Sequence, residues 1–321
     1  MTTPRRVRAT GIALACLLVL SACGSNDESD SPDGQDGPTP VTISTQPIVD
    51  SAPLHLGLEQ GFFEEEGIDL TIESAAGGAA VIPSVVSGEH EFGRGNLLSS
   101  MIAREQGLDI QCIANANTAQ GDPDFSAVLV MPDSGIESPA DLEGRTVSVN
   151  TLNNIGDTII RTAIQRDGGD ESTVEFIEVP FPEAPAALET GQVDAVWAVE
   201  PFVTEALDMG ATVISWPFAE MHPDLDVSCV FTSGALIEDD PELVDAFARA
   251  VDRSLEFSEE NPDEVRRITG TYTEIDEDVL ERMVLPRFVP EMSREAAEFL
   301  AEKAIEFGTM SEQPDLDLLL P

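Results

Sequence analysis

The sequence predicts an α/β fold of two doubly wound lobes, each with a mainly parallel sheet covered by helices on both faces. Short apolar runs alternate with helical stretches from Val41 onward, and this alternation restarts after Met131. A helix end, a glycine and an acidic residue that opens a strand recur at residues 85–92 and 188–195, once in each predicted lobe. The 321-residue chain is long enough for two such lobes.

The first lobe is predicted from alternating elements that end at glycine stops. Its strands are expected at 41–45, 68–73, 91–93 and 110–115, and its helices at 54–60, 79–86 and 97–106. Gly61, Gly88 and Gly107 follow the three helices, where a residue with positive φ is needed to end a helix.

The second lobe and the return to the first are predicted in the same way. Its strands are expected at 145–149, 174–179, 193–199 and 212–215, and its helices at 155–166, 184–189 and 201–207. The apolar run 227–237 carries the chain back, and helices at 241–259, 262–268, 276–285 and 294–307 pack on the outside of the first lobe. Lobe 1 thus comprises residues 41–125 and 230–321, and lobe 2 residues 126–229.

The N-terminus has the features of a targeting segment. Arginines at positions 5, 6 and 8 precede an apolar stretch at 12–20, which is too short for a permanent membrane span. It ends in Leu20-Ser21-Ala22-Cys23, which resembles a bacterial lipobox; an ordinary cleavage site beside a chance cysteine is the alternative. We expect a lipoprotein signal peptide at 1–22, lipid on Cys23 and a flexible tether at 23–40.

Net charge, cysteines and histidines exclude several functional classes. The net charge of −45 argues against nucleic-acid binding, which requires a basic face. Export implies an oxidising compartment, where Cys112 and Cys229 either form a disulfide or remain buried thiols. The histidines, His55, His90 and His222, lack metal-ligand spacing, so we expect neither a metal nor a cofactor.

Four segments carry a family resemblance. They are APLHLGLEQGFF at 52–63, AGG at 76–78 followed by VSGEHEFG at 86–93, DLEGRTV at 141–147, and ALETGQVDA at 187–195 followed by EPF at 200–202. In this order they resemble the nitrate, sulfonate, taurine and thiamine-pyrimidine group of periplasmic binding proteins, which contain the NMT1/THI5 domain. Arg145 stands where that group has lysine.

The resemblance implies a type II periplasmic-binding-protein fold with two lobes, a two-strand hinge and a ligand cleft. Together with the lipobox-like string, it predicts a monomeric solute-binding lipoprotein on the extracytoplasmic face of the cell membrane. Such a protein captures a small-molecule solute for the permease and ATPase subunits of an ABC importer and is not an enzyme.

Ligands of such folds bind beyond the carboxyl ends of strands, where helix N-termini also point. The candidate ligand-binding residues are Gln46, Asp50, Gly77, Gly78, Arg94, Asn96, Asn117, Thr151, Asn153, Asn154, Trp197 and Glu200. Helix capping, a surface ion pair or core packing are the alternative roles. Arg94 and the glycine loop favour an anion such as a sulfonate, whereas Trp197 with Glu200 favours an amine or aminopyrimidine; the sequence leaves both open.

An enzyme is the rival class. Relatives with this domain include pyrimidine synthases that use a lysine-linked pyridoxal phosphate, but the sole lysine, Lys303, falls in the C-terminal helix away from the predicted cleft. The sequence also lacks the Gly-x-Ser-x-Gly motif of many hydrolases. A sensor lipoprotein is a third alternative.

Overall fold

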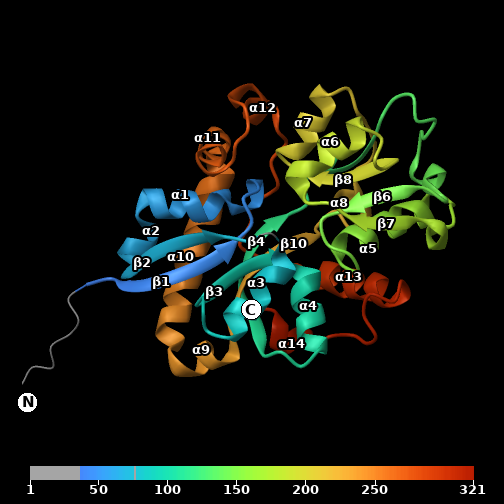
Figure 1. The fold of residues 1–321 in the computed structure, drawn as a ribbon. Helices are drawn as coiled ribbons and strands as arrows, with labels where there is room; N and C mark the ends of the chain where they lie inside the picture. The colour runs from blue at the N-terminus through green and yellow to red at the C-terminus, as the bar shows by residue number, and fades with distance from the viewer. Residues whose placement is uncertain (1–36, 76) are drawn as a thin grey trace, which may run out of the picture. The chain divides into compact units, whose positions relative to one another are not determined.

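The computed structural model describes residues 37–75 and 77–321, which contain two five-stranded sheets (Figure 1). The first sheet has the spatial order β2 (Ile68–Ser74), β1 (Thr39–Thr45), β3 (Phe92–Asn96), β10 (Asp226–Ser233) and β4 (Ile110–Thr118). The second has the order β7 (Glu175–Glu178), β6 (Thr146–Val149), β8 (Ala195–Val199), β5 (Ser126–Val130) and β9 (Thr212–Ser215). The predicted α/β class with two sheets is confirmed. Each sheet with its helices is called a lobe below, numbered in the same order.

One strand in each sheet runs against the others. β10 pairs antiparallel with β3 and β4, and β5 pairs antiparallel with β8 and β9, whereas β1 and β6 pair in parallel with their neighbours. β5 and β10 are the strands that the chain enters after crossing from the other sheet. The sheets are therefore mainly parallel, as predicted, and the reversed strands mark the two crossings.

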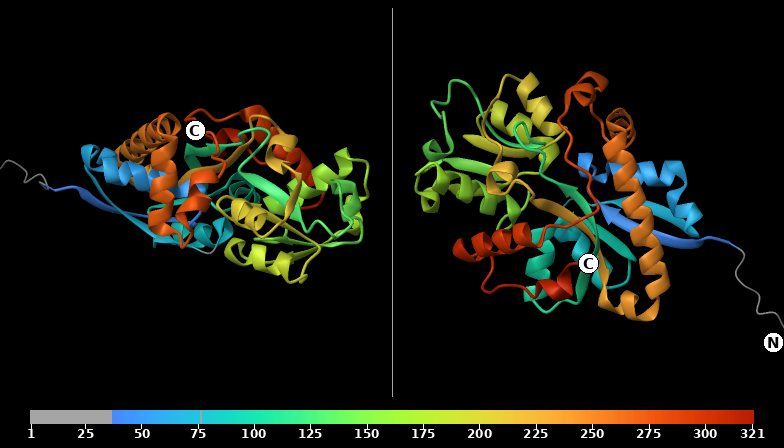
Figure 2. Two further views of the ribbon diagram at one scale, coloured as in Figure 1. Left: turned by 90° about the horizontal axis from the view of Figure 1, so that it is seen from above. Right: turned by 180° about the vertical axis from the view of Figure 1, so that it is seen from behind.

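Helices surround both sheets. Lobe 1 has α1 (Ala52–Gln60), α2 (Phe62–Glu65), α3 (Gly78–Val86), α4 (Leu97–Glu105), α9 (Gly234–Asp239), α10 (Pro241–Glu260), α11 (Pro262–Tyr272), α12 (Glu277–Arg282), α13 (Arg294–Glu306) and α14 (Leu316–Leu319). Lobe 2 has α5 (Ile155–Arg166), α6 (Ala184–Glu189), α7 (Phe202–Asp208) and α8 (Pro217–Met221). The long helix α10 lies along the first sheet (Figure 2), and α13 contacts both α4 and α5.

The packing of α1 against α10 explains part of the first sequence motif. A Cβ on Gly57 would lie 1.9 Å from Ser254 Oγ, so only glycine lets the two helices approach this closely. Phe63 on α2 packs against Phe247 on α10, and Phe247 in turn stacks on Phe92 of β3 with ring centroids 3.8 Å apart. These buried rings fix α10 to the sheet.

Some predicted boundaries were wrong. β5 was not predicted, although its five residues are all buried. β3 continues to Asn96 and β4 to Thr118, so Arg94 and Asn117 lie inside strands and not beyond their ends. Both extensions follow from pairing with β10, which the local sequence pattern does not reveal.

The two remaining cysteines form a disulfide. Cys112 on β4 and Cys229 on β10 are bonded, with Cα atoms 5.8 Å apart. Both side chains are fully buried. The bond therefore joins two adjacent strands of the first sheet, one of which carries residues of the cavity described below.

Within residues 37–75 and 77–321, no helix combines the length and the apolar character needed to cross a membrane. The predicted signal peptide, Cys23 and most of the tether lie outside the described residues.

Candidate functional site

A small cavity of about 20 Å³ lies between the two sheets, well below the usual range for ligand pockets of about 300–1,000 Å³. Its lining residues come from both lobes: Gln46, Ile48, Asp50, Arg94, Asn96, Val227 and Ser228 from lobe 1 and its hinge, and Asn150, Ile155, Phe181, Trp197, Val199 and Phe218 from lobe 2. The sequence placed Gln46, Asp50, Arg94, Asn96 and Trp197 in the site, and the structure brings these five together.

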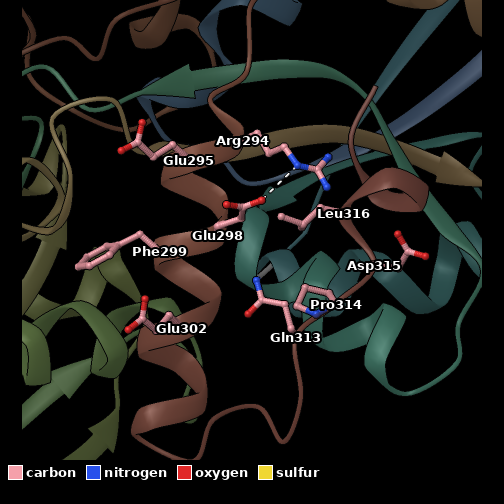
Figure 3. Close-up of a pocket in the computed structure, with 9 residues that line it drawn as sticks. All are labelled: Arg294, Glu295, Glu298, Phe299, Glu302, Gln313, Pro314, Asp315 and Leu316. Carbon is pink, nitrogen blue, oxygen red and sulfur yellow. Dashed lines mark hydrogen bonds and ion pairs between the residues drawn. The ribbon is translucent and has the colours of Figure 1, made fainter.

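A larger hollow lies elsewhere on the surface, between α13 and residues 313–316 (Figure 3). Its lining includes Glu295, Glu298 and Glu302 on α13, and it shares no residue with the cavity between the sheets. Arg294 is already paired with Glu298 and with Asp317. This hollow offers four carboxylates, including Asp315, and no unpaired basic side chain among its lining residues, so we do not assign it to the solute.

Aromatic rings form one wall of the cavity. Trp197 on β8 is buried, and its Nε1 donates to Ser126 Oγ at 2.7 Å. Phe181 and Phe218 meet the indole edge-on, with centroids 5.1 and 5.8 Å from it. A Cβ on Gly156 would lie 2.7 Å from Trp197 Cε3, so glycine lets α5 pack directly on the indole. The indole is therefore held in one orientation, with the two phenylalanine rings steeply inclined to it.

Arg94 lies at the opposite side, buried in β3 with 2% of its surface exposed. Its Nε donates to Thr45 Oγ1 at 2.8 Å, and its Nη1 donates to Asp50 Oδ2 and to Ser228 Oγ, both at 3.1 Å. Burial lowers the pKa of Arg94, and the Asp50 charge opposes this shift. The guanidinium is thus an internal partner of a carboxylate and not the surface arginine that was the alternative.

Asp50 is the other half of this buried ion pair. Burial raises the pKa of Asp50, and the Arg94 charge opposes the rise, as does the nearby Asn117 amide. In the described part of the chain, Asp50 Oδ1 and Asn117 Nδ2 make no hydrogen bond of normal geometry. Asn117 Oδ1 accepts a hydrogen bond from Ser228 Oγ. Asp50, which lines the cavity, therefore keeps one acceptor oxygen without a well-formed hydrogen bond, with the Asn117 amide nearby.

Two predicted asparagines cap helices at the lobe interface. Asn96 Oδ1 accepts from Ser99 N at the start of α4, and Asn154 Oδ1 accepts from Ile155 N at the start of α5. Asn154 Nδ2 also donates to Ser99 Oγ at 3.0 Å. Asn154 thus joins the N-termini of one helix from each lobe, and Asn96 both caps and lines the cavity.

The glycine loop and the loop after β6 also meet across the interface. A Cβ on Gly77 would lie 3.5 Å from Thr151 Oγ1 and 3.9 Å from Gln46 Nε2. Gly78 begins α3 beside it. Asn153 is exposed with a φ of 51°, and its N–H donates to Asp157. Gly77 and Thr151 therefore lie next to a cavity residue, whereas the Asn153 side chain is at the surface.

Glu200 is placed differently from Trp197. It is not among the residues that line the cavity. Its Oε2 accepts from Thr204 N at 3.0 Å, and its Oε1 accepts from Thr204 Oγ1 at 2.8 Å and from Val284 N at 3.0 Å. Burial raises its pKa to about 7. Glu200 therefore ties lobe 2 to the segment after α12, and the suggested pairing with Trp197 at a ligand is not formed.

Several cavity residues were not predicted. Phe181 and Phe218 follow the ends of β7 and β9, so the strand-end rule that selected the other candidates also applies to them. Ser228 lies inside β10, where no local pattern distinguishes it. In the part of the chain that the structure describes, no group of three or more His, Cys, Asp or Glu side chains is arranged to hold a metal ion.

Two mixed α/β sheets with two crossings and a polar, aromatic cavity between them define the type II fold of periplasmic binding proteins. The chain belongs to the NMT1/THI5-like family, whose model matches residues 48–265.

Relatives with known names agree with this assignment. The formylaminopyrimidine-binding protein of Halalkalibacterium halodurans is 27% identical over 80% of this chain and 77% of its own. The riboflavin-binding protein RibY of Chloroflexus aurantiacus is 23% identical over 89% and 84%. Among solved structures, the alkanesulfonate-binding protein SsuA of Xanthomonas axonopodis pv. citri bound to MOPS has a TM-score of 0.75 at 15% identity, covering 89% of this chain and 99% of its own.

Proposed function

We propose that this protein is the extracytoplasmic solute-binding component of an ABC importer, which holds one small molecule between its lobes and delivers it unchanged to a permease. The observation that carries the proposal is the cavity whose walls come from both sheets. Closure of two lobes around a ligand is the motion that such an arrangement permits. The binding-protein names of the curated relatives support the same role.

The ligand class that suits the cavity is a planar nitrogen heterocycle of the aminopyrimidine kind. Trp197 and its neighbouring phenylalanines offer a surface for stacking. Gln46, Asn96 and Asn150 add side-chain amides that recognise ring nitrogens and amino groups. The names of two relatives, which denote a formylaminopyrimidine and riboflavin as ligands, both point to planar nitrogen heterocycles.

A pyridoxal-phosphate enzyme is the second candidate, and the position of Lys303 argues against it. Lys303 is the only lysine of the chain. It lies on α13, where its Nζ donates to Gln165 Oε1 at 2.9 Å and to Glu306 Oε2 at 2.7 Å. It does not line the cavity. A Schiff base requires a lysine at the site.

The lipid anchor and the lobe boundaries belong to the proposal. The Leu20-Ser21-Ala22-Cys23 string supports cleavage after residue 22 and lipid on Cys23, with residues 23–40 as tether. Residues 41–125 with 230–321, and residues 126–229, are the predicted moving bodies, except that residues 226–229 belong to β10 of the first sheet and would move with lobe 1. Incorporation of labelled palmitate tests the anchor: label should be absent from Cys23→Ala, and label that persists in this variant would reject it.

Tryptophan fluorescence tests the proposed ligand site. The chain has two tryptophans, Trp197 in the cavity and Trp216 outside its lining. We expect formylaminopyrimidine to change the emission of Trp216→Phe, which retains only Trp197, with saturation at one ligand per chain. In the matched variant Trp197→Phe, the change should be lost. No response to aminopyrimidines, flavins or sulfonates in Trp216→Phe, or conversion of any of them to product, would contradict the proposal.

A further inference from the structure

The buried pair of Arg94 and Asp50 raises the question of why a solute cavity contains an arginine that is already neutralised. Both residues line the cavity, and their exposed fractions are 2% and 4%. An arginine in a buried pocket without a carboxylate is a strong receptor for anions, because its charge is poorly screened there. Here the nearest carboxylate belongs to the protein, at 3.1 Å from Nη1.

The remaining Arg94 bonds go to neutral hydroxyl groups. Thr45 and Ser228 accept from Nε and Nη1, so they orient the guanidinium without changing its charge. Asp50 is therefore the group that cancels the positive charge at the cavity wall. An anionic solute that reached Arg94 would also lie close to the Asp50 carboxylate. The negative charges of the solute and of Asp50 would then repel each other strongly, because both are buried.

Asp50 also offers a hydrogen-bond acceptor to an amino-substituted ligand. It lies in the short helical turn Val49–Ser51 that leads into α1, and its Oδ1 makes no hydrogen bond of normal geometry among the described residues, although the Asn117 amide is nearby. A buried carboxylate oxygen without a donor is costly unless a ligand supplies one. An amino group or ring N–H of the ligand is such a donor, and a sulfonate or nitrate has none.

We propose that Asp50 sets the charge selectivity of the cavity: its ion pair with Arg94 excludes anionic solutes, and its second oxygen accepts an N–H of an amino-substituted heterocycle. The inference rests on the proposed function, because it takes the cavity as the solute site. It also implies that proteins with this fold differ in the charge of the solute they prefer, since two structural neighbours are named for binding the anions alkanesulfonate and nitrate.

The substitution Asp50→Asn tests this selectivity, because it keeps the size of the side chain and leaves the Arg94 charge uncompensated. Calorimetric titration of wild type and variant with formylaminopyrimidine and with methanesulfonate gives the ratio of the two affinities. We expect Asp50→Asn to bind formylaminopyrimidine at least tenfold more weakly and to gain measurable methanesulfonate binding.

Two further variants control the result. Asp226→Asn removes an equally buried carboxylate that bonds to Thr118, Asn115 and Ser293 N outside the cavity lining, so it should keep the wild-type ratio. The double variant Asp50→Asn/Arg94→Gln removes both charges, so it should lose methanesulfonate binding again. The double variant also tests the inference if Asp50→Asn alone does not fold. We expect the double variant to bind formylaminopyrimidine at least tenfold more weakly than wild type does, and an affinity equal to that of wild type would overturn the inference.

Failure of this inference is distinguishable from failure of the proposed function. If wild type binds neither compound, the function assigned to the cavity is wrong. If wild type binds formylaminopyrimidine and Asp50→Asn keeps the wild-type ratio of affinities, the function stands and the role of Asp50 is overturned. Methanesulfonate binding by wild type as tight as that of Asp50→Asn would overturn it as well.

Discussion

Glu200 should make the stability of this protein depend on pH between about 4.5 and 7. The carboxylate is 1% exposed and accepts three hydrogen bonds, two from Thr204 and one from Val284 N. Burial raises its pKa from 4.5 to about 7, although the N–H donors of Val284 and Thr204 oppose the rise. The folded protein therefore binds this proton more tightly than the unfolded chain does.

The sign and size of the effect follow from that shift. Stability from a carboxyl group with a raised pKa is fully present below the unfolded pKa and is lost as pH rises through the folded pKa. The shift from 4.5 to about 7 corresponds to about 3 kcal/mol, since each pKa unit is worth about 1.4 kcal/mol. The free energy of unfolding should therefore fall by about this amount from pH 4.5 to above pH 7 through Glu200 alone.

Glu200→Gln removes the titration but keeps the shape of the side chain. One amide oxygen can still accept from Thr204 Oγ1 and Val284 N, while the amide NH₂ faces the Thr204 N–H and leaves that donor unpaired. An unpaired buried donor costs about 1–3 kcal/mol. We therefore expect the variant to be less stable than wild type by about 1–3 kcal/mol at pH 5. At pH 8, where wild type has lost about 3 kcal/mol, the variant should be as stable as wild type or up to about 2 kcal/mol more stable.

Urea unfolding of both proteins from pH 5 to 8 measures this difference directly. Other buried carboxylates titrate in the same range, such as Asp124, whose pKa burial raises to about 6. Their contributions cancel when the two curves are subtracted, because both proteins contain them. Curves that stay parallel across this range would refute the reasoning, since they would show that Glu200 has the same pKa in the folded and unfolded states.

Three other changes have expected outcomes. Reduction of the Cys112–Cys229 disulfide should lower the free energy of unfolding by about 2–4 kcal/mol, and urea midpoints with and without dithiothreitol measure it; equal midpoints would contradict a structural role. Phe247→Ala should cost about 3–5 kcal/mol, because the ring is fully buried against two others; a loss below about 1 kcal/mol in urea unfolding would contradict this packing. Gly156→Ala should displace the Trp197 indole and weaken formylaminopyrimidine binding about tenfold or more; unchanged calorimetric affinity would show that α5 yields without moving the ring.

Elements with strong local signals were predicted well from the sequence. The helices Ile155–Arg166 and Ala184–Glu189 and the strand Thr212–Ser215 have the predicted bounds, because capping residues, glycine stops and periodicity are all local. β5 was missed because nothing in a short apolar run reveals which strands it will pair with. For the same reason, the reversal of β5 and β10 depends on the path between the sheets and not on their own residues.

The candidate site was predicted in part for similar physical reasons. Strand-end positions brought Gln46 and Asn96 to the cavity, since a parallel sheet gathers such positions at one edge. The partner of Arg94 lies 44 residues away in sequence, so the neutralisation of its charge is a property of the tertiary fold. Glu200 was misplaced because its donors, Thr204 and Val284, are brought together only when the segment after α12 meets lobe 2.

A crystal structure of the protein with formylaminopyrimidine tests the central claim most directly. We expect the intact compound between the sheets, with its ring against Trp197 and an amino group within hydrogen-bond distance of Asp50 Oδ1. Density for the compound only in the surface hollow beside α13, or density for a chemically altered product in the cavity, would contradict this account.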